Sequence, residues 1–273
     1  MKNLDLKMPV KWNDLTPKQL LYVCELYLLN LTELKFKTWV FLNFTGVKAL
    51  PKQIIADRVY YFFKKKRTRF SLTAEEFHWF LHSADFLLSD SHLTKNLFPQ
   101  IRILNKRFFG PSNSCYNISV HEFIFAEKMI DLFHAGKDKK YLRKLCAILY
   151  RQQKKNYNPK SPDFNGDRRE TFNDFTFERR ARLFRFLSAK KQYAVYIFYI
   201  GCRNALIEKH PYLFNSASVS SETSKTGENL KNLLVILNQG DITRNKEILK
   251  SQIWEAFSQL NELARQNKQN SKK

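Results

Sequence analysis

Three side chains in this sequence have the spacing of metal ligands on a helix. His78 and His82 stand four residues apart and Asp85 follows three residues later, so in a helix all three project within a narrow sector. Trp79 occupies the position that a glutamate takes in the H-E-x-x-H zinc motif. The three positions also border an apolar stripe, where an amphipathic helix commonly carries histidine. We treat His78, His82 and Asp85 as weak candidates and expect no bound metal.

A group of acidic residues lies in and just after the long polar segment over residues 151–173. Two carboxylates in such a loop could hold a divalent metal for nuclease chemistry. Their spacing matches no nuclease motif, and turn-forming aspartates in a solvated loop are the simpler interpretation. The residues are Asp163, Asp167, Glu170 and Asp174.

Glycine occurs seven times, at widely separated positions. A phosphate-binding loop needs two or three glycines within about eight residues, because its backbone must turn sharply and approach phosphate closely. No serine stands in the G-x-S-x-G arrangement of a nucleophile elbow. The sequence therefore predicts a non-enzymatic protein with no catalytic residues and no cofactor.

Positive charge is the strongest compositional feature, with 47 Lys and Arg against 25 Asp and Glu and a formal net charge of +22. Such an excess favours a polyanionic partner or a charged assembly. The densest basic run directly follows four aromatic residues at 60–63, an arrangement that could neutralise phosphates and stack on bases. The solvated end of a helix is the competing interpretation. The run consists of Lys64, Lys65, Lys66, Arg67 and Arg69.

A second basic cluster overlaps the end of the long polar segment and the helix expected after it. Its side chains are arginines, whose planar forks suit carboxylates and phosphates. Acidic neighbours such as Glu178 could instead pair with them along a helix. The two clusters together support nucleic-acid binding through residues 64–69 and 179–185. The arginines of the second cluster are Arg168, Arg169, Arg179, Arg180, Arg182 and Arg185.

Helix signals recur along the chain and would position these clusters. Thr16 with Gln19 and Thr73 with Glu76 form capping-box patterns ahead of apolar helical stripes. Pro51 is expected to open a helix that continues to residue 62. Further helices are predicted from residue 32 to 44, from 119 to 136, from 138 to 149, and over 174–187 and 189–209.

The fold class that follows is all-α, with two helical lobes, a flexible linker and a C-terminal helical segment. Residues 101–104 alone suggest an extended segment. The predicted parts are an N-terminal lobe (1–96), an irregular connector (97–118), a second lobe (119–213), a Ser/Thr-rich linker (214–228), C-terminal helices (229–267) and a basic tail (268–273).

Four short segments together resemble helical proteins from the tail modules of phages and prophages. They are WNDLTPKQL (12–20), LCAILYR (145–151), GCRN (201–204) and IWEAF (253–257). The resemblance implies a non-enzymatic role in tail assembly, either as a chaperone that holds a helical tape-measure protein or as a minor structural protein. It implies no functional residues and does not account for the positive charge.

The C-terminal helix is the surface that we expect to hold such a partner. An amphipathic helix behind a flexible linker could bury the apolar face of another helix, with Trp254, Phe257 and Leu260 as contacts. The same residues would also suit docking within the chain. Nucleic-acid binding through the two basic clusters is the alternative function.

The location of the protein follows from apolar runs and cysteines. The longest apolar run, residues 193–200, is far shorter than the roughly 20 residues of a membrane span. The four cysteines are scattered singly, as in a reducing compartment. We therefore expect a protein of the host-cell cytoplasm without a membrane partner, with incorporation into a virion as the alternative.

Overall fold

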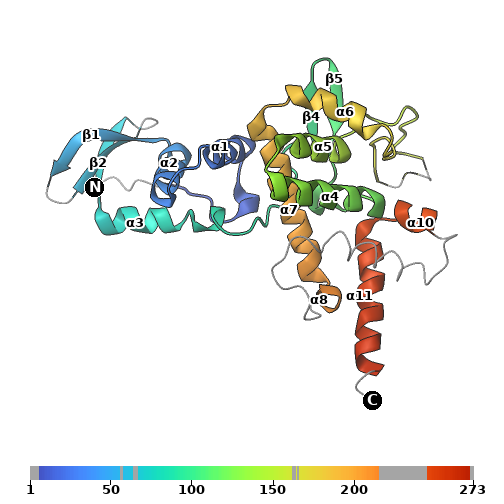
Figure 1. The fold of residues 1–273 in the computed structure, drawn as a ribbon. Coiled ribbons are helices and arrows are strands. Elements are labelled where there is room, and N and C mark those ends of the chain that lie inside the picture. Colours follow the sequence, from blue (N-terminus) through green and yellow to red (C-terminus); the bar gives the residue numbers. More distant parts are fainter. Residues whose placement is uncertain are drawn as a thin grey trace. The chain divides into compact units, whose positions relative to one another are not determined.

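The computed structural model describes residues 6–55, 58–63, 67–161, 164, 166–214 and 245–270. The chain divides into two compact units, Met1–His92 and Leu93–Lys273. Most of the predicted linker and residues 229–244 of the predicted C-terminal helices lie outside the described residues, as do Asp163 and Lys64 to Lys66. Figure 1 labels most of the helices and strands of both units.

The first unit combines helices with a three-stranded antiparallel sheet. Both predicted capping boxes are confirmed, because the Thr16 and Thr73 hydroxyls accept bonds from the backbone N–H groups of Gln19 and Glu76. Gly46 ends the second helix in the left-handed conformation. The elements are η1 (Trp12–Asp14), α1 (Pro17–Tyr27), α2 (Glu33–Thr45), β1 (Val47–Ile55), β2 (Arg58–Phe63), β3 (Thr68–Thr73), α3 (Ala74–His82) and η2 (Asp85–Leu87).

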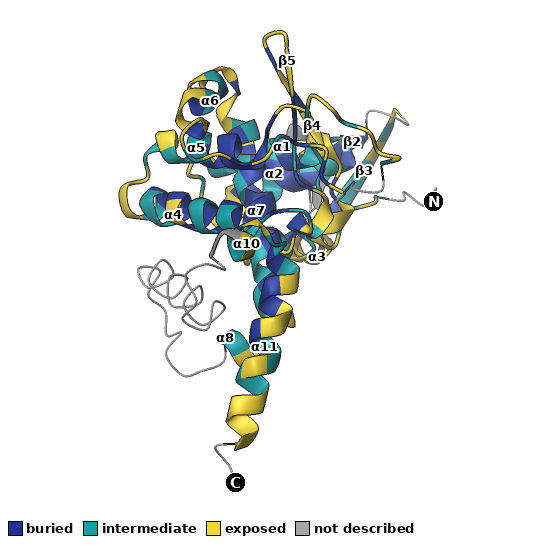
Figure 2. Ribbon diagram, turned by 90° about the vertical axis from the view of Figure 1, so that its right-hand side faces the viewer, coloured by how far each residue is buried: buried dark blue, intermediate teal, exposed yellow. Residues whose placement is uncertain are grey.

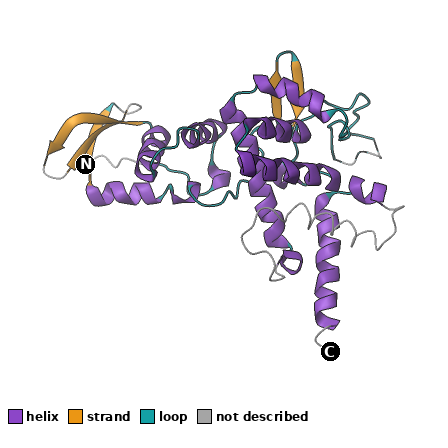
Figure 3. Ribbon diagram, in the orientation of Figure 1, coloured by secondary structure: helices purple, strands orange, loops and turns teal. Residues whose placement is uncertain are grey.

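The all-α prediction is wrong, and the helix expected from Pro51 to residue 62 is the main error. That stretch forms β1 and β2, which pair with each other and then with β3 in the order β1-β2-β3 (Figure 3). Proline lacks an N–H donor but is tolerated on an edge strand, and the β1–β2 register shifts between Ala49 and Ile54 around it. The aromatic run of β2 suits a strand whose alternate residues are buried, as Tyr61 and Phe63 are.

The second unit is mainly helical, with a hairpin inside the segment that we expected to be an irregular connector. The hairpin confirms the extended segment near residue 101 and pairs Gln100 with Phe109 through Ile103 with Lys106. The elements of the second unit are β4 (Gln100–Ile103), β5 (Lys106–Phe109), η3 (Asn113–Cys115), α4 (Val120–Gly136), α5 (Lys139–Leu149), α6 (Phe177–Leu183), η4 (Phe184–Phe186), α7 (Ala189–Lys209), α8 (Pro211–Phe214), α10 (Asn245–Lys250) and α11 (Ile253–Asn270).

Helix α5 lies at the centre of this unit. Its residues 145–149 are completely buried, and it packs against α4, α6 and α7. Figure 2 shows this burial and the exposed tip of the β4–β5 hairpin. None of the described helices is long and apolar enough to cross a membrane.

Gly201 is essential to the packing of α7. A Cβ atom at this position would lie 2.4 Å from both the backbone N and the backbone O of Leu93. Gly201→Ala should therefore lower the free energy of unfolding by about 1–3 kcal/mol or more, although alanine is the better helix former. Thermal unfolding measures the loss. The matched control is Gly136→Ala in α4, where a Cβ would meet nothing within 4 Å; equal melting temperatures for the two variants would contradict the packing argument.

Candidate functional site

The three weak metal candidates lie in the first unit, where His82 binds Asp85, Asp85 also binds a lysine, and the His78 ring lies 4.7 Å from that of His82. Nδ1 of His82 lies 2.9 Å from Oδ2 of Asp85, and the Lys37 ammonium lies 2.5 Å from Oδ1 of the same carboxylate. Hydrogen bonds from Lys37 and His82 hold the pKa of Asp85 below its usual range. Among the described residues, no three His, Cys, Asp or Glu side chains gather as metal ligands. The geometry therefore gives Asp85 an ion-pair role.

The described part of the first basic run belongs to a hairpin of strands and not to a helix end. Arg67 lies in the turn between β2 and β3 with a φ of 48°, and Arg69 pairs with Phe62 across the sheet. Both arginines are exposed. The three lysines of the run lie outside the described residues, so the structure does not place the run as a surface.

The candidate partner contacts on α11 pack against residues of the same unit. The indole N–H of Trp254 donates a 2.9 Å hydrogen bond to the carbonyl oxygen of Ser114. Phe257 and Leu260 are each 2% exposed, and the Phe257 ring lies 5.5 Å from that of Phe123. These three side chains are thus docked within the chain. Docking within the chain is the alternative to partner binding that the sequence leaves open for this helix.

A buried ion network fixes the long polar segment that begins at residue 151. Arg151 lies 2.8 Å from Oε2 of Glu122, and Arg169 lies 2.8 Å from Oδ1 of Asp167. A 3.3 Å contact between Arg169 and Glu122 joins the two pairs. All four side chains are almost completely buried, and Glu122 comes from the first turn of α4. Two arginines and two carboxylates give a balanced charge.

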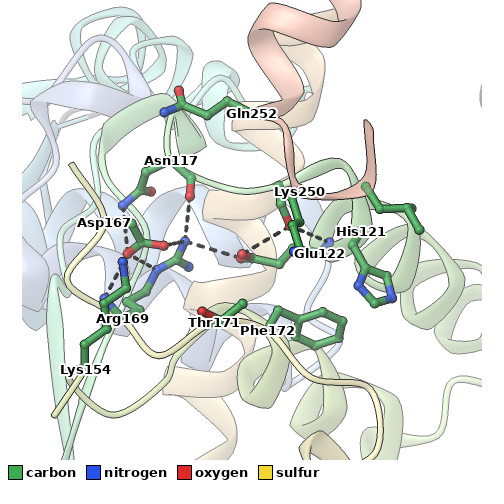
Figure 4. A pocket seen from close by; sticks show the side chains of 12 residues that line it. Asn117, His121, Glu122, Lys154, Asp167, Arg169, Thr171, Phe172, Lys250 and Gln252 are labelled. Carbon is green, nitrogen blue, oxygen red and sulfur yellow. Dashed lines mark hydrogen bonds and ion pairs between the residues drawn. The ribbon is translucent and has the colours of Figure 1, made fainter. Parts of the chain in front are cut away.

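The network forms one wall of a pocket of about 310 Å³, shown in Figure 4. Lys154, Lys250 and His121 line it together with Glu122 and Asp167. Both carboxylates face guanidinium groups, so neither has the freedom of a general base. We therefore assign this pocket a structural role, in which the network ties the long segment to α4.

A row of exposed aromatic and arginine side chains runs along α6 and its ends. Phe175 and Phe186 are 89% and 54% exposed, and Arg179 and Arg182 between them are also exposed. Arg179 and Arg182 lie three residues apart on α6, whereas Phe175 precedes the helix and Phe186 ends the short 3-10 helix η4 that follows it. Residues 177, 181 and 184 of the same segment are buried in the unit. We call Phe175, Arg179, Arg182 and Phe186 the α6 stripe.

The sequence singles out the arginines of this stripe but not its aromatic residues. The available signal is that Phe175 and Phe186 each stand four residues from one of those arginines. Arg185 is exposed beside them, with its guanidinium 4.7 Å from the centre of the Phe186 ring. Arg180 is the exception, because it points toward the interior of the unit and donates to the carbonyl oxygen of Ala147.

The β4–β5 hairpin carries further exposed positive charge. Arg102 and Arg107 pair directly across the two strands, and Lys106 is adjacent; all three are exposed. Like charges that face each other across strands are destabilising by themselves. We call these three residues the basic hairpin. An anion lying over these residues would relieve the repulsion between Arg102 and Arg107.

A pocket of about 390 Å³ joins the basic hairpin to the α6 stripe. Lys106 of β5 and Arg179 and Arg180 of α6 line it, and Glu170 is the one carboxylate among its described lining residues. We call it the Arg180 pocket. Its full lining consists of Lys106, Phe108, Gln152, Glu170, Thr176, Arg179, Arg180 and Leu183.

Comparisons with known proteins give no information on the α6 stripe, the basic hairpin or the Arg180 pocket, so their chemistry alone guides the interpretation. The chain matches no protein-family model, no curated protein and no solved structure.

Proposed function

We propose that this protein binds single-stranded nucleic acid across the α6 stripe and the basic hairpin. The observation that carries the proposal is the exposure of Phe175, at 89%, four residues before the exposed Arg179 and seven before the exposed Arg182. An exposed aromatic ring can stack on an unpaired base, at about 1–3 kcal/mol per base, while arginines neutralise the phosphates on either side. Stacking of this kind needs bases that a duplex would keep paired and covered.

Five cations supply the phosphate contacts. Two lie on the α6 stripe and three on the basic hairpin, and the Arg180 pocket connects the two groups. The cross-strand pair of Arg102 and Arg107 supports a polyanion over a neutral protein partner, because a polyanion relieves their repulsion. Arg169 does not contribute, since it is buried in the ion network, whereas Arg168 is exposed and its guanidinium lies 4.0 Å from the centre of the Phe109 ring.

Tail assembly, which the resemblance implies, stays a prediction. The contacts that we expected on α11, Trp254, Phe257 and Leu260, are packed within the second unit. A helical partner would have to displace that packing or bind elsewhere. The exposed arginine and aromatic residues therefore favour nucleic acid as the first function to test.

Fluorescence anisotropy of labelled DNA and RNA over a salt series tests the proposal. We expect single strands to bind more tightly than duplexes of the same length. If all five cations contact phosphates, the slope of log affinity against log salt should be about −3.5 for a single strand. Inorganic polyphosphate is the control ligand, because it carries the charge without bases. If polyphosphate competes as well as an oligonucleotide of equal charge, stacking plays no part and the proposal fails.

A further inference from the structure

Arg180 is a buried cation with incomplete hydrogen bonding. Its side chain is 11% exposed, and its nearest carboxylate oxygen, on Glu170, lies 3.8 Å from Nη1. Nε donates to the carbonyl oxygen of Ala147 at 2.8 Å, while Nη2 is buried without a hydrogen-bond partner. An unpaired buried donor on a charged group is costly. A ligand anion at the pocket would offset part of that cost.

The surroundings of Arg180 increase its need for a counter-charge. Burial and the nearby positive charge of Arg151 lower the pKa of Arg180 to about 10. The carboxylate of Glu170 raises the pKa of Arg180 only weakly, because the Glu170 side chain is 42% exposed and its oxygen lies 3.8 Å from Nη1 of Arg180. At neutral pH the guanidinium is still charged, so the pocket presents a cation that the protein itself leaves partly uncompensated.

The charge lining the Arg180 pocket matches a phosphate monoester. Lys106, Arg179 and Arg180 supply three positive charges and Glu170 supplies one negative charge. The excess of two corresponds to the charge of about −1.5 to −2 on a phosphate monoester at neutral pH. An internal phosphodiester carries a single negative charge and is flanked by sugars on both sides. A strand end therefore fits this pocket better than the middle of a strand.

Neutral groups complete the lining. Thr176 and Gln152 offer a hydroxyl and an amide, while Phe108 and Leu183 provide apolar walls. Arg179 belongs both to this pocket and to the α6 stripe, and Thr176 of the lining directly follows Phe175 in the chain, so the pocket adjoins the stripe. We infer that the Arg180 pocket binds the terminal phosphate of a nucleic-acid strand whose adjoining bases stack on the α6 stripe. This assignment rests on the proposed function.

The test compares one oligonucleotide in three forms, with a 5′-phosphate, with a 3′-phosphate and with neither. We expect one of the phosphorylated forms to bind at least about tenfold more tightly, the equivalent of one charge-assisted hydrogen bond. Equal affinities of all three forms would overturn the inference while the binding itself still supports the proposed function. Failure of all three to bind would overturn both.

Two variants locate the preference in the pocket. Arg180→Gln should bring the phosphorylated and unphosphorylated forms to equal affinity, and circular dichroism checks that it folds. Lys106→Gln, on the exposed hairpin, should reduce the preference without a folding risk. A preference that survives in both variants places the phosphate elsewhere. Titration with inorganic phosphate separates the two sources of this anion: phosphate that binds more tightly than the phosphorylated strand would overturn the assignment to a strand end.

Discussion

Arg169→Met is expected to lower the free energy of unfolding of the second unit by about 3–5 kcal/mol, because it breaks a buried ion pair and leaves charge behind. Arg169 donates from Nε and Nη2 to the two oxygens of Asp167, each at 2.8 Å. It also donates to the carbonyl oxygens of Leu149 and Asn117. Without it, Arg151 alone would face two buried carboxylates, and two carbonyl groups would lose a donor.

Urea denaturation followed by hydrogen-exchange mass spectrometry measures this loss. Peptides from α4 and α5 report on the second unit separately from residues 1–92. Arg182→Met is the matched control, because it removes an exposed arginine and should change stability by no more than about 0.5 kcal/mol. Adding Asp167→Asn to Arg169→Met removes one stranded charge and should restore part of the loss. A cost below about 1 kcal/mol for Arg169→Met would show that the network does not fix the long segment.

Helix ends in this chain could be predicted from sequence because their determinants are local. A threonine three residues before a glutamine or glutamate forms a capping box, in which each side chain accepts a hydrogen bond from the backbone N–H of the other residue, as at Thr16 and Thr73. Gly46 ends a helix through its own backbone conformation. None of these features depends on a distant part of the chain.

The strands could not be predicted in the same way, because pairing is not local. Residues 54–63 are apolar at positions that fit a helix as well as a strand, and Pro51 suits the start of a helix as well as an edge strand. The pairing of β2 with β1 and β3 decides between the two. Strand β3 overlaps the basic run at residues 64–69, for which a helix end is one of two interpretations from sequence, because Arg69 lies within the strand.

The arginine cluster shows why a candidate site needs tertiary structure. In sequence, Arg169, Arg179 and Arg180 belong to one basic group. In the structure, Arg169 is buried in the ion network, Arg180 is mostly buried at a pocket, and Arg179 is exposed. Burial of each side chain is set by the helices packed around it, which residue spacing does not reveal. The three arginines consequently have different roles.

Phe175→Ala together with Phe186→Ala should weaken the binding of single strands by at least about thirtyfold, because each ring contributes about 1–3 kcal/mol of stacking. The salt dependence should not change, since no cation is removed. The double change Arg179→Gln with Arg182→Gln should instead make the slope of log affinity against log salt shallower by about 1.4, or 0.7 for each lost phosphate contact. Anisotropy titrations of both variants at several salt concentrations distinguish the two effects.

Tyr212→Ala is the matched control for the aromatic pair, because Tyr212 is 46% exposed in the same unit but lies on α8. Its loss should leave the affinity unchanged. Both rings of the α6 stripe are exposed, so their removal should also leave the melting temperature of the unit unchanged. If the aromatic variant binds like the wild type while the arginine variant loses affinity, the surface attracts polyanions by charge alone. Stacking, and with it the preference for single strands, would then be excluded.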